Sequence, residues 1–309
     1  MIGYCKNVIP YMLNWIKETV YWPALHGYER ALENMLFSPY FMGGIILILI
    51  LEKIIPAKKD QKILRLGLIQ DAVWVFIEIF FQAVVVAAYS FFLKSLFENY
   101  CSYLTMEATG RWPYWIRFAW GIILADFLAW VHHWLKHKVS WFWLFHAVHH
   151  SQKELNMFTD LRYHFVEYLI SRTVVVIPLL IFAVDVPQIT IYIIIKDWYT
   201  RFYHSNIKTN LGVLRYIFVT PQSHRIHHSM AKEHRDKNFA VIFSVWDFLF
   251  HTQYCGFNEY PETGITDEEF PLETKAEIKS LILTPLRQLI YPFQVVARRL
   301  NQPKPKKEN

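Results

Sequence analysis

The sequence has few cysteines and few charged residues. Its three cysteines, Cys5, Cys101 and Cys255, are far apart and odd in number, which excludes a disulfide framework and a CxxC metal site. We therefore expect three unpaired thiols. Only 19% of the 309 residues are charged, against about 25% in a typical soluble domain, and 54% are hydrophobic. This balance favours a protein that is embedded in a membrane.

The sequence also lacks a linker rich in glycine, serine or proline and a tandem repeat, and its first residues do not resemble a cleavable signal peptide. We therefore expect one membrane-embedded unit with a short polar tail. Its predicted parts are an N-terminal interfacial segment, transmembrane helices, a histidine-rich core that includes a transmembrane hairpin, and a C-terminal cytosolic segment with a basic tail. These parts cover residues 1–39, 40–125, 126–255 and 256–309, respectively.

The net charge of +6 could suggest a nucleic acid partner, but the distribution of the basic residues argues against one. They gather at the ends of apolar segments, as at Lys58, Lys59, Lys62 and Arg65. Lysine and arginine in such positions are typical of loops at the cytosolic membrane surface. We therefore expect contact with a membrane and none with nucleic acid.

Long apolar stretches dominate the first two thirds of the chain. Four of them approach or exceed the roughly 20 residues that a helix needs to cross a bilayer. They cover residues 41–56, 68–97, 115–131 and 165–195, and the last is broken at "VDVPQ", which indicates a helical hairpin. The pattern predicts an all-α polytopic bundle with about four to five transmembrane helices.

The order of these stretches predicts the sidedness of the chain. If the basic loop "PAKKDQKILRLG" is cytosolic, the next two helices leave and return, and His133 emerges on the cytosolic side. The hairpin then begins and ends on that side, with His164 before it and His204 after it. All histidine clusters should therefore lie in a cytosolic helical cap that holds a site for two metals.

The histidines form three tight patterns. "HHWLKH" contains His133 and His137 at positions i and i+4, and "HAVHH" and "HRIHH" each have histidines at i, i+3 and i+4. On a helix each trio would lie on one side, so we expect each to direct its nitrogens to a common point. The trios are His146, His149 and His150, and His224, His227 and His228. We expect His26, His132, His234 and His251, outside these patterns, to be ordinary polar residues.

Eight imidazoles without thiolates favour iron, zinc, copper or nickel. Because a structural zinc is closed by four ligands, eight histidines favour two metals over one. Adjacent histidines such as His227 and His228 point about 100° apart on a helix, which disfavours a haem pair. A metal transporter would need ligands along a path through the membrane, whereas these residues cluster at its edge.

The segments "DFLAWVHHWLKH", "FHAVHHS" and "TPQSHRIHHS" resemble the fatty acid hydroxylase/sterol desaturase superfamily of integral-membrane di-iron enzymes. The resemblance runs from about Asp126 to Thr252, includes "RYHFVE", "YHSNI" and "NFAVIFSVWDFLFHT", and looks nearest to the alkylglycerol-monooxygenase-like group. Trp134, Phe165 and Ala240 depart from the usual pattern, but none of them removes a histidine. They leave the subfamily open.

The resemblance implies a set of site residues. It assigns the eight histidines of the three patterns as metal ligands and His164 and His204 as additional ligands. It also places Asp126, Glu167 and Asn206 beside the ligands, where carboxylates could orient imidazoles or could instead pair with Arg162 or with backbone groups. No catalytic residue beyond the ligands is implied.

The resemblance further implies two irons, O2 as co-substrate, and hydroxylation or desaturation of a C–H bond in a fatty acyl, sterol or ether lipid. Electrons must come from outside, because the chain has no GxGxxG fingerprint and no "HPGG" motif. A cytochrome b5 or ferredoxin-type reductase system, or a reduced pterin, would supply them. Two alternatives stay open: a catalytically inactive metal-binding membrane protein and a metal transporter.

The implied location is the endoplasmic reticulum in a eukaryote or the inner membrane in a bacterium, and the oligomeric state is left open. The tail "NQPKPKKEN" is expected to be disordered. Its last four residues resemble a dilysine retrieval signal, or they are an ordinary cytosolic lysine tail.

Overall fold

The computed structural model describes residues 39–61, 66–78, 83–184, 186–272 and 277–301. The N-terminal interfacial segment and the basic tail predicted from the sequence lie almost entirely outside these ranges. Within the described ranges every regular element is a helix and there is no β-strand, so the predicted all-α class is confirmed.

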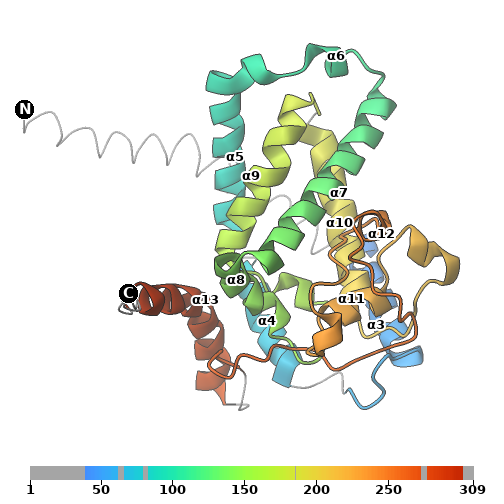
Figure 1. Cartoon of the computed structure of the whole chain (residues 1–309), viewed down its shortest axis with the longest axis vertical. Coiled ribbons are helices and arrows are strands. Elements are labelled where there is room, and N and C mark those ends of the chain that lie inside the picture. Colours follow the sequence, from blue (N-terminus) through green and yellow to red (C-terminus); the bar gives the residue numbers. More distant parts are fainter. Residues whose placement is uncertain (1–38, 62–65, 79–82, 185, 273–276, 302–309) are drawn as a thin grey trace, which may run out of the picture.

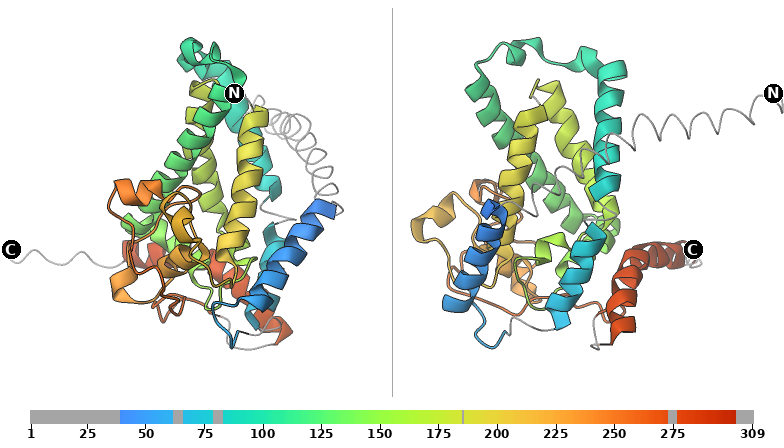
Figure 2. Two further views of the ribbon diagram at one scale, coloured as in Figure 1. Left: turned by 90° about the vertical axis from the view of Figure 1, so that its right-hand side faces the viewer. Right: turned by 180° about the vertical axis from the view of Figure 1, so that it is seen from behind.

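Four long helices form an elongated bundle (Figures 1 and 2). They are α5 (Ala83–Leu96), α7 (Tyr114–Lys138), α9 (Phe165–Ile181) and α10 (Val186–His204), and α9 packs against both α5 and α7. The connection from α5 to α7 closes the far end of the bundle. It contains η3 (Phe97–Cys101), η4 (Ser102–Leu104) and α6 (Glu107–Gly110).

The other helices and the loops between them gather at the opposite end, which we call the near end (Figure 1). There α8 (Ser140–His150) packs against α7 and α9, and α11 (Pro221–His227) packs against α10. The other helices of this end are α3 (Pro39–Ile54), α4 (Leu66–Ile77), η5 (Thr159–Leu161), η6 (Gly212–Tyr216), η7 (Lys232–His234), α12 (Val245–Leu249) and α13 (Ile278–Asn301).

The interior of the bundle is apolar. Ala125 on α7 meets Val175 and Leu179 on α9, and Tyr192 on α10 joins the same buried cluster. Gly121 is required at the closest approach, because a β-carbon there would lie 2.9 Å from a methyl group of Val184 in the turn between α9 and α10. A larger residue would push this turn away from α7.

Each apolar stretch of the sequence is helical where it is described, but the helices differ in length. Among the described residues, α7 alone is long and apolar enough to cross a membrane by itself. Because α9 has 17 residues, it is about 25 Å long at 1.5 Å per residue. The predicted number of spans therefore stays a prediction.

The hairpin differs from the prediction in its second helix. The sequence pattern ends at Ile195, whereas α10 continues to His204 through Lys196, Asp197 and Arg201. Thr200 in this extension donates a hydrogen bond to Asp160 (3.1 Å), and Lys196 and Asp197 form an ion pair (2.8 Å). Trp198 and Tyr203 in the same turns pack into hydrophobic clusters. Polar contacts and aromatic packing together hold the extra turns, which carry His204 to the near end.

Candidate metal centre

Nine histidines converge at the near end and form two groups. Within each group the candidate ligand nitrogens lie within 4.8 Å of one another. The first group contains His133, His137, His146, His150 and His227, and the second contains His149, His204, His224 and His228. The eight histidines of the three sequence patterns are therefore brought together, and His204 joins them.

Each HxxHH trio is divided between the two groups, which differs from the expectation that each trio faces one point. On α8, His146 and His150 belong to the first group while His149 belongs to the second. Helical neighbours point about 100° apart, so residues i and i+4 share a direction that residue i+3 does not. On α11 the arrangement is reversed, because His227 faces the first group and His224 and His228 face the second.

The two groups adjoin each other. The rings of His150 and His228 are stacked with their centroids 4.2 Å apart, although they belong to different groups. The rings of His149 and His228, both in the second group, are 4.7 Å apart. Two ions bound by these groups would therefore be neighbours.

In the first group, all five Nε2 atoms are buried and have no hydrogen-bond partner. Backbone carbonyls fix two of these rings: Nδ1 of His133 donates to Phe239 O (2.8 Å) and Nδ1 of His227 donates to Lys237 O (2.9 Å). Because Nδ1 carries the proton, Nε2 keeps its lone pair. Five unpaired nitrogens at one point are costly unless a cation binds them, so this group fits a metal ion.

Glu167 on α9 orients a third ring of the first group. Its Oε2 accepts from Nδ1 of His146 (2.9 Å) and from Nζ of Lys136 (3.0 Å), and all three side chains are buried. A carboxylate behind a histidine ligand fixes the tautomer and raises the basicity of the ring. The predicted role of Glu167 beside the ligands thus has a direct geometric counterpart.

In the second group, the four Nε2 atoms are in contact with one another. The distances are 3.1 Å from His204 to His149, 2.8 Å from His224 to His204, and 3.0 Å from His228 to His224. Nitrogens that bind one ion at about 2.1 Å and subtend a right angle lie about 3.0 Å apart. Nδ1 of His204 donates to Thr200 O (2.7 Å), which leaves its Nε2 unprotonated. The donor set therefore fits a metal ion here as well.

Burial keeps these imidazoles neutral. It lowers the pKa values of His146, His149, His150 and His228 well below the usual 6.5, and it lowers that of His227 to about 4. Neighbouring lysine and histidine charges act in the same direction. Neutral imidazole is the form that binds metals.

Local sequence signals set α11 in place. Pro221 occupies the first turn, and Thr220 and Ser223 form a reciprocal capping box, in which each backbone N–H donates to the other residue's hydroxyl at 2.9 Å. These residues belong to the "TPQSHRIHH" motif, so the motif encodes the start of the helix as well as its histidines.

Two of the predicted neighbours of the ligands contact no histidine. Asp126 accepts hydrogen bonds from the backbone of Ile242 (2.9 Å) and Phe243 (3.0 Å) and from the indole of Trp246. Asn206 joins α11 to the loop after α3, because its Oδ1 accepts from Arg225 (3.1 Å) and from Lys58 N. Both residues position backbone segments around the centre. Asp126 therefore pairs with backbone groups, which is one of the roles that the sequence left open for it.

His164 lies outside both groups. Its Nε2 donates to Leu289 O on α13 (2.9 Å), and its Nδ1 accepts from Val166 N at the start of α9 (3.2 Å). Both ring nitrogens are therefore used by the backbone, and the additional ligand role expected for His164 has no counterpart in the structure. This residue caps α9 and joins it to α13.

Two buried carboxylates, Asp247 and Asp71, were not predicted from the sequence. Asp247 accepts from the backbone N–H groups of Phe239 (2.9 Å) and Ala240 (2.8 Å) and from Trp130, and so holds the segment whose carbonyl fixes His133. Asp71 on α4 pairs with Arg162 in the interior. A lone aspartate in an apolar run carries no pattern, so only the fold reveals these partners.

The remaining described histidines stand apart from the two groups. His132 is buried beside Phe142, His234 contacts Ser229 Oγ (2.9 Å), and His251 is exposed. Their exclusion from the metal groups agrees with the sequence pattern. His26 lies outside the described residues.

The fold and the site define an all-helical protein with two adjoining, buried polyhistidine groups suited to metal ions. The fatty acid hydroxylase family model matches residues 118–252, which contain all nine histidines. The matched region and the relatives described below support the superfamily assignment made from the sequence.

Several characterised proteins are similar to the chain. An ornithine lipid hydroxylase of Rhizobium tropici is 24% identical over 80% of this chain and 77% of its own length. Alkylglycerol monooxygenases of Xenopus tropicalis and Homo sapiens are 30% and 27% identical over 74% and 65% of this chain. These matches cover only 51% and 42% of the two monooxygenases. No solved structure matches the chain.

Proposed function

We propose that this protein is a membrane-embedded di-iron oxygenase that uses O2 and external electrons to hydroxylate a C–H bond of a lipid. The observation that carries the proposal is the pair of adjoining groups that present nine imidazoles and no thiolate. Imidazole donors suit iron among the first-row metals. The names of the relatives, which are a hydroxylase and monooxygenases, support oxygen chemistry over hydrolysis or transport.

Two irons bound at these groups would supply the activation of O2 and the removal of hydrogen from an unactivated carbon. The protein's own residues hold and insulate that chemistry. Glu167 and the carbonyls of Phe239 and Lys237 fix the rings of the first group, and Thr200 O fixes His204 in the second. Because the ligand nitrogens are buried, the site excludes bulk water.

Several helix faces support contact with lipid. Ile46 on α3, Ile123 on α7 and Ile194 on α10 are about half exposed, at 52%, 44% and 54%, on helices that pack around the centre. Large apolar side chains on the outside of a bundle are the expected lipid-facing surface of a membrane protein. The helices α8 and α11, which carry histidines of both groups, lie at one end of this bundle (Figure 1), so a lipid could reach the histidines from the side.

The relatives narrow the substrate class. Ornithine lipids and alkylglycerols both combine long hydrocarbon chains with a polar end. We therefore propose that this chain hydroxylates a lipid of that kind. A reductase system or a reduced pterin would supply the electrons.

Metal content is the first test. Detergent-purified protein is expected to hold about two irons per chain, as two ligand groups predict. A His149→Ala/His227→Ala variant, which removes one ligand from each group, should lose them. A His251→Asn variant is the matched control, because His251 is exposed, lies outside both groups and has a positive φ of 57° that asparagine tolerates.

The second test is turnover on an alkylglycerol and on an ornithine lipid, with O2 and a chemical reductant. We expect an O2-dependent hydroxylated product from one of them and none from the double variant. Two zincs with no turnover would support the metal-binding alternative, and metal flux into liposomes would support the transporter. Fewer than two metals after anaerobic ferrous reconstitution would contradict the dinuclear centre.

A further inference from the structure

We propose that α13 is an in-plane membrane-binding helix whose partner is an anionic bilayer surface. This inference rests on the membrane placement in the proposed function and adds to it the element that fixes how deeply the histidine centre sits. The sequence pattern assigned residues 256–309 only to a cytosolic segment.

The apolar side of α13 is exposed along its length. Ile282, Leu286, Ile290 and Phe293 are 52%, 45%, 52% and 47% exposed, and Leu300 is 80% exposed. Their spacing of three and four residues places most of them on one side of the helix. The ring of Phe293 also packs against Phe145 and His164, yet every member of the strip stays at least 45% exposed within the described residues.

The charge of α13 fits an anionic surface. Its described helix contains Lys279, Arg287, Arg298 and Arg299 and no acidic residue. Basic amphipathic helices bind membranes by burying the apolar side between headgroups and by attracting anionic lipids. Apolar area and positive charge therefore point to the same partner.

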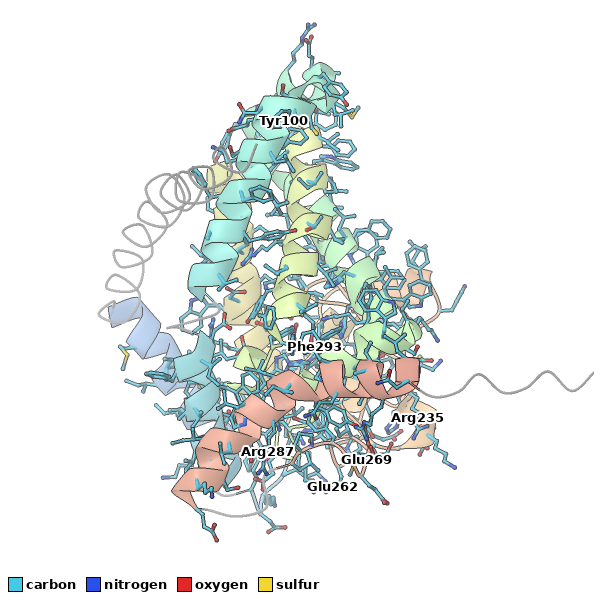
Figure 3. All side chains as sticks on the ribbon, turned by 90° about the vertical axis from the view of Figure 1, so that its left-hand side faces the viewer. Tyr100, Arg235, Glu262, Glu269, Arg287 and Phe293 are labelled. Atoms are coloured by element: carbon cyan, nitrogen blue, oxygen red, sulfur yellow. The ribbon has the colours of Figure 1, made fainter. Side chains whose placement is uncertain are left out.

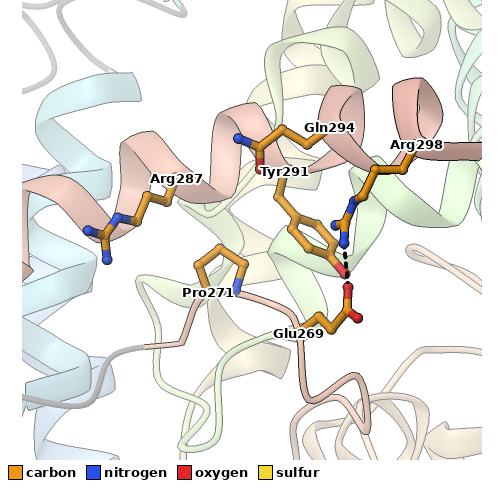
Figure 4. Close-up of a pocket in the computed structure, with 6 residues that line it drawn as sticks. All are labelled: Glu269, Pro271, Arg287, Tyr291, Gln294 and Arg298. Carbon is orange, nitrogen blue, oxygen red and sulfur yellow. Dashed lines mark hydrogen bonds and ion pairs between the residues drawn. The ribbon is translucent and has the colours of Figure 1, made fainter. Parts of the chain in front are cut away.

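Contacts on the polar side hold the helix in this orientation. The hydroxyl of Tyr291 donates to Asp267 (2.6 Å), and Arg298 pairs with Glu269 (2.7 Å). Figure 4 shows the polar pocket on this side, which is lined by Glu269, Pro271, Arg287, Tyr291, Gln294 and Arg298. Because this side is tied to the segment before it, the apolar strip cannot turn inward without breaking these contacts.

The direction of the second half of α13 also fits a membrane plane. Figure 3 shows that α13 is bent: the half that carries Arg287 rises obliquely toward the near end, and the half from Phe293 onward crosses that end at a steep angle to α5 and α9. The helix contains Pro285 and Pro292, and proline kinks helices. At the far end Tyr100, Tyr103 and Trp115 are 72%, 79% and 70% exposed. Tyrosine and tryptophan favour membrane interfaces, so the bundle is bounded by an aromatic end and by α13.

Side chains of α13 contact residues next to the histidine centre. The ring of Phe293 lies 5.5 Å from the rings of both Phe145 and His164, and Leu289 O accepts the hydrogen bond from His164. Phe145 precedes His146 on α8. An α13 seated at the interface would therefore hold α8 at a fixed depth.

Spin labels can test the position of α13 in the full chain. Cys5, Cys101 and Cys255 are replaced by serine, and single cysteines are introduced as Ile290→Cys, Arg287→Cys and Ile123→Cys. The protein is reconstituted in vesicles of phosphatidylcholine and phosphatidylglycerol. At position 290 the label should collide more with oxygen than with a water-soluble nickel complex, whereas at position 287 it should favour the nickel complex.

The other outcomes separate this inference from the proposed function. If positions 123 and 290 both favour the nickel complex, the membrane placement itself fails. If position 123 favours oxygen while position 290 favours nickel or is shielded from both reagents, α13 faces water or a protein and the inference is overturned. The metal content of each variant shows whether it has folded.

The charge of the lipid tests the second part of the inference, which is that the partner of α13 is an anionic surface. Phosphatidylglycerol should raise the oxygen preference of the label at position 290 above its value in phosphatidylcholine alone. An Arg287→Gln/Arg299→Gln variant should lose most of that rise, while Arg111→Gln, which changes an exposed arginine at the far end, should keep it. An equal preference in both vesicle types would overturn the role of anionic lipid.

Discussion

Glu167 and His146 form a buried hydrogen bond of 2.9 Å that links the bundle to the histidine centre. The carboxylate comes from the first turn of α9 and the imidazole from the middle of α8. Lys136 on α7 contacts the same carboxylate oxygen at 3.0 Å. One carboxylate oxygen of Glu167 thus links α7, α8 and α9 next to His146.

Replacing this carboxylate should weaken metal binding without removing a ligand. Glu167→Gln is expected to lower the metal affinity of the first group by about 10- to 100-fold, because partners behind ligands have effects of this size. Competition with a coloured chelator measures the change. Lys136→Met, which keeps Glu167, should lower the metal affinity less. An equal loss of affinity in both variants would show that the Lys136–Glu167 ion pair, and not the hydrogen bond to His146, is responsible.

His204 and His164 should behave differently. His204→Ala removes one of four nitrogens of the second group and should reduce the metal content from about two ions toward about one per chain. His164→Ala should leave the metal content unchanged, because both of its nitrogens bond to backbone groups. Elemental analysis measures the metal content of both variants. A loss of metal from the His164→Ala variant would make His164 a tenth ligand.

Asp247 should matter for stability more than an ordinary aspartate. It accepts hydrogen bonds from Phe239 N, Ala240 N, Trp130 and Thr252, and an amide can accept with only one oxygen. Asp247→Asn is expected to cost about 1–3 kcal/mol, since Oδ2 accepts from Ala240 N and an amide NH2 in its place leaves that buried N–H unpaired. Thermal unfolding in detergent measures this, with the exposed Asp60→Asn as control. A shift no larger than that of the control would refute the role of Asp247.

Acidification should destabilise the metal-free protein. Burial lowers the pKa of His227 to about 4, whereas an unfolded histidine titrates near 6.5. Between these values the unfolded chain binds more protons, so stability rises with pH and is lost as the pH falls from about 6.5 to about 4. His227 alone accounts for roughly 3 kcal/mol across this window. The thermal unfolding midpoint of the metal-free protein should therefore fall as the pH is lowered through this range. A midpoint that does not change with pH would contradict a buried, neutral His227.

Much of the centre could be predicted from the sequence because its ligands lie in short helical patterns. The spacing of "HAVHH" identifies three adjacent imidazoles whatever the tertiary fold, and the all-α class follows from the apolar stretches. The division of each trio could not be predicted, because it depends on what packs against both sides of α8. Likewise the role of Asp247 depends on Trp130, which lies 117 residues earlier in the chain.

The length of α10 shows a different limit. The hydrophobic run is interrupted at Lys196 and Asp197, yet the helix continues because Trp198 and Tyr203 pack into hydrophobic clusters and Thr200 bonds to Asp160. Aromatic packing and one tertiary hydrogen bond thus hold these turns. A pattern based on hydrophobicity alone therefore ends the helix before it reaches His204.

The division of the trios has a mechanical consequence. His149 and His150 are joined by one peptide bond and belong to different groups, and so do His227 and His228. Two rigid helices therefore span both groups, and no hinge lies between them. The backbones of α8 and α11 would therefore set the spacing of two ions bound at these groups, and a movement of either helix would shift ligands of both groups together.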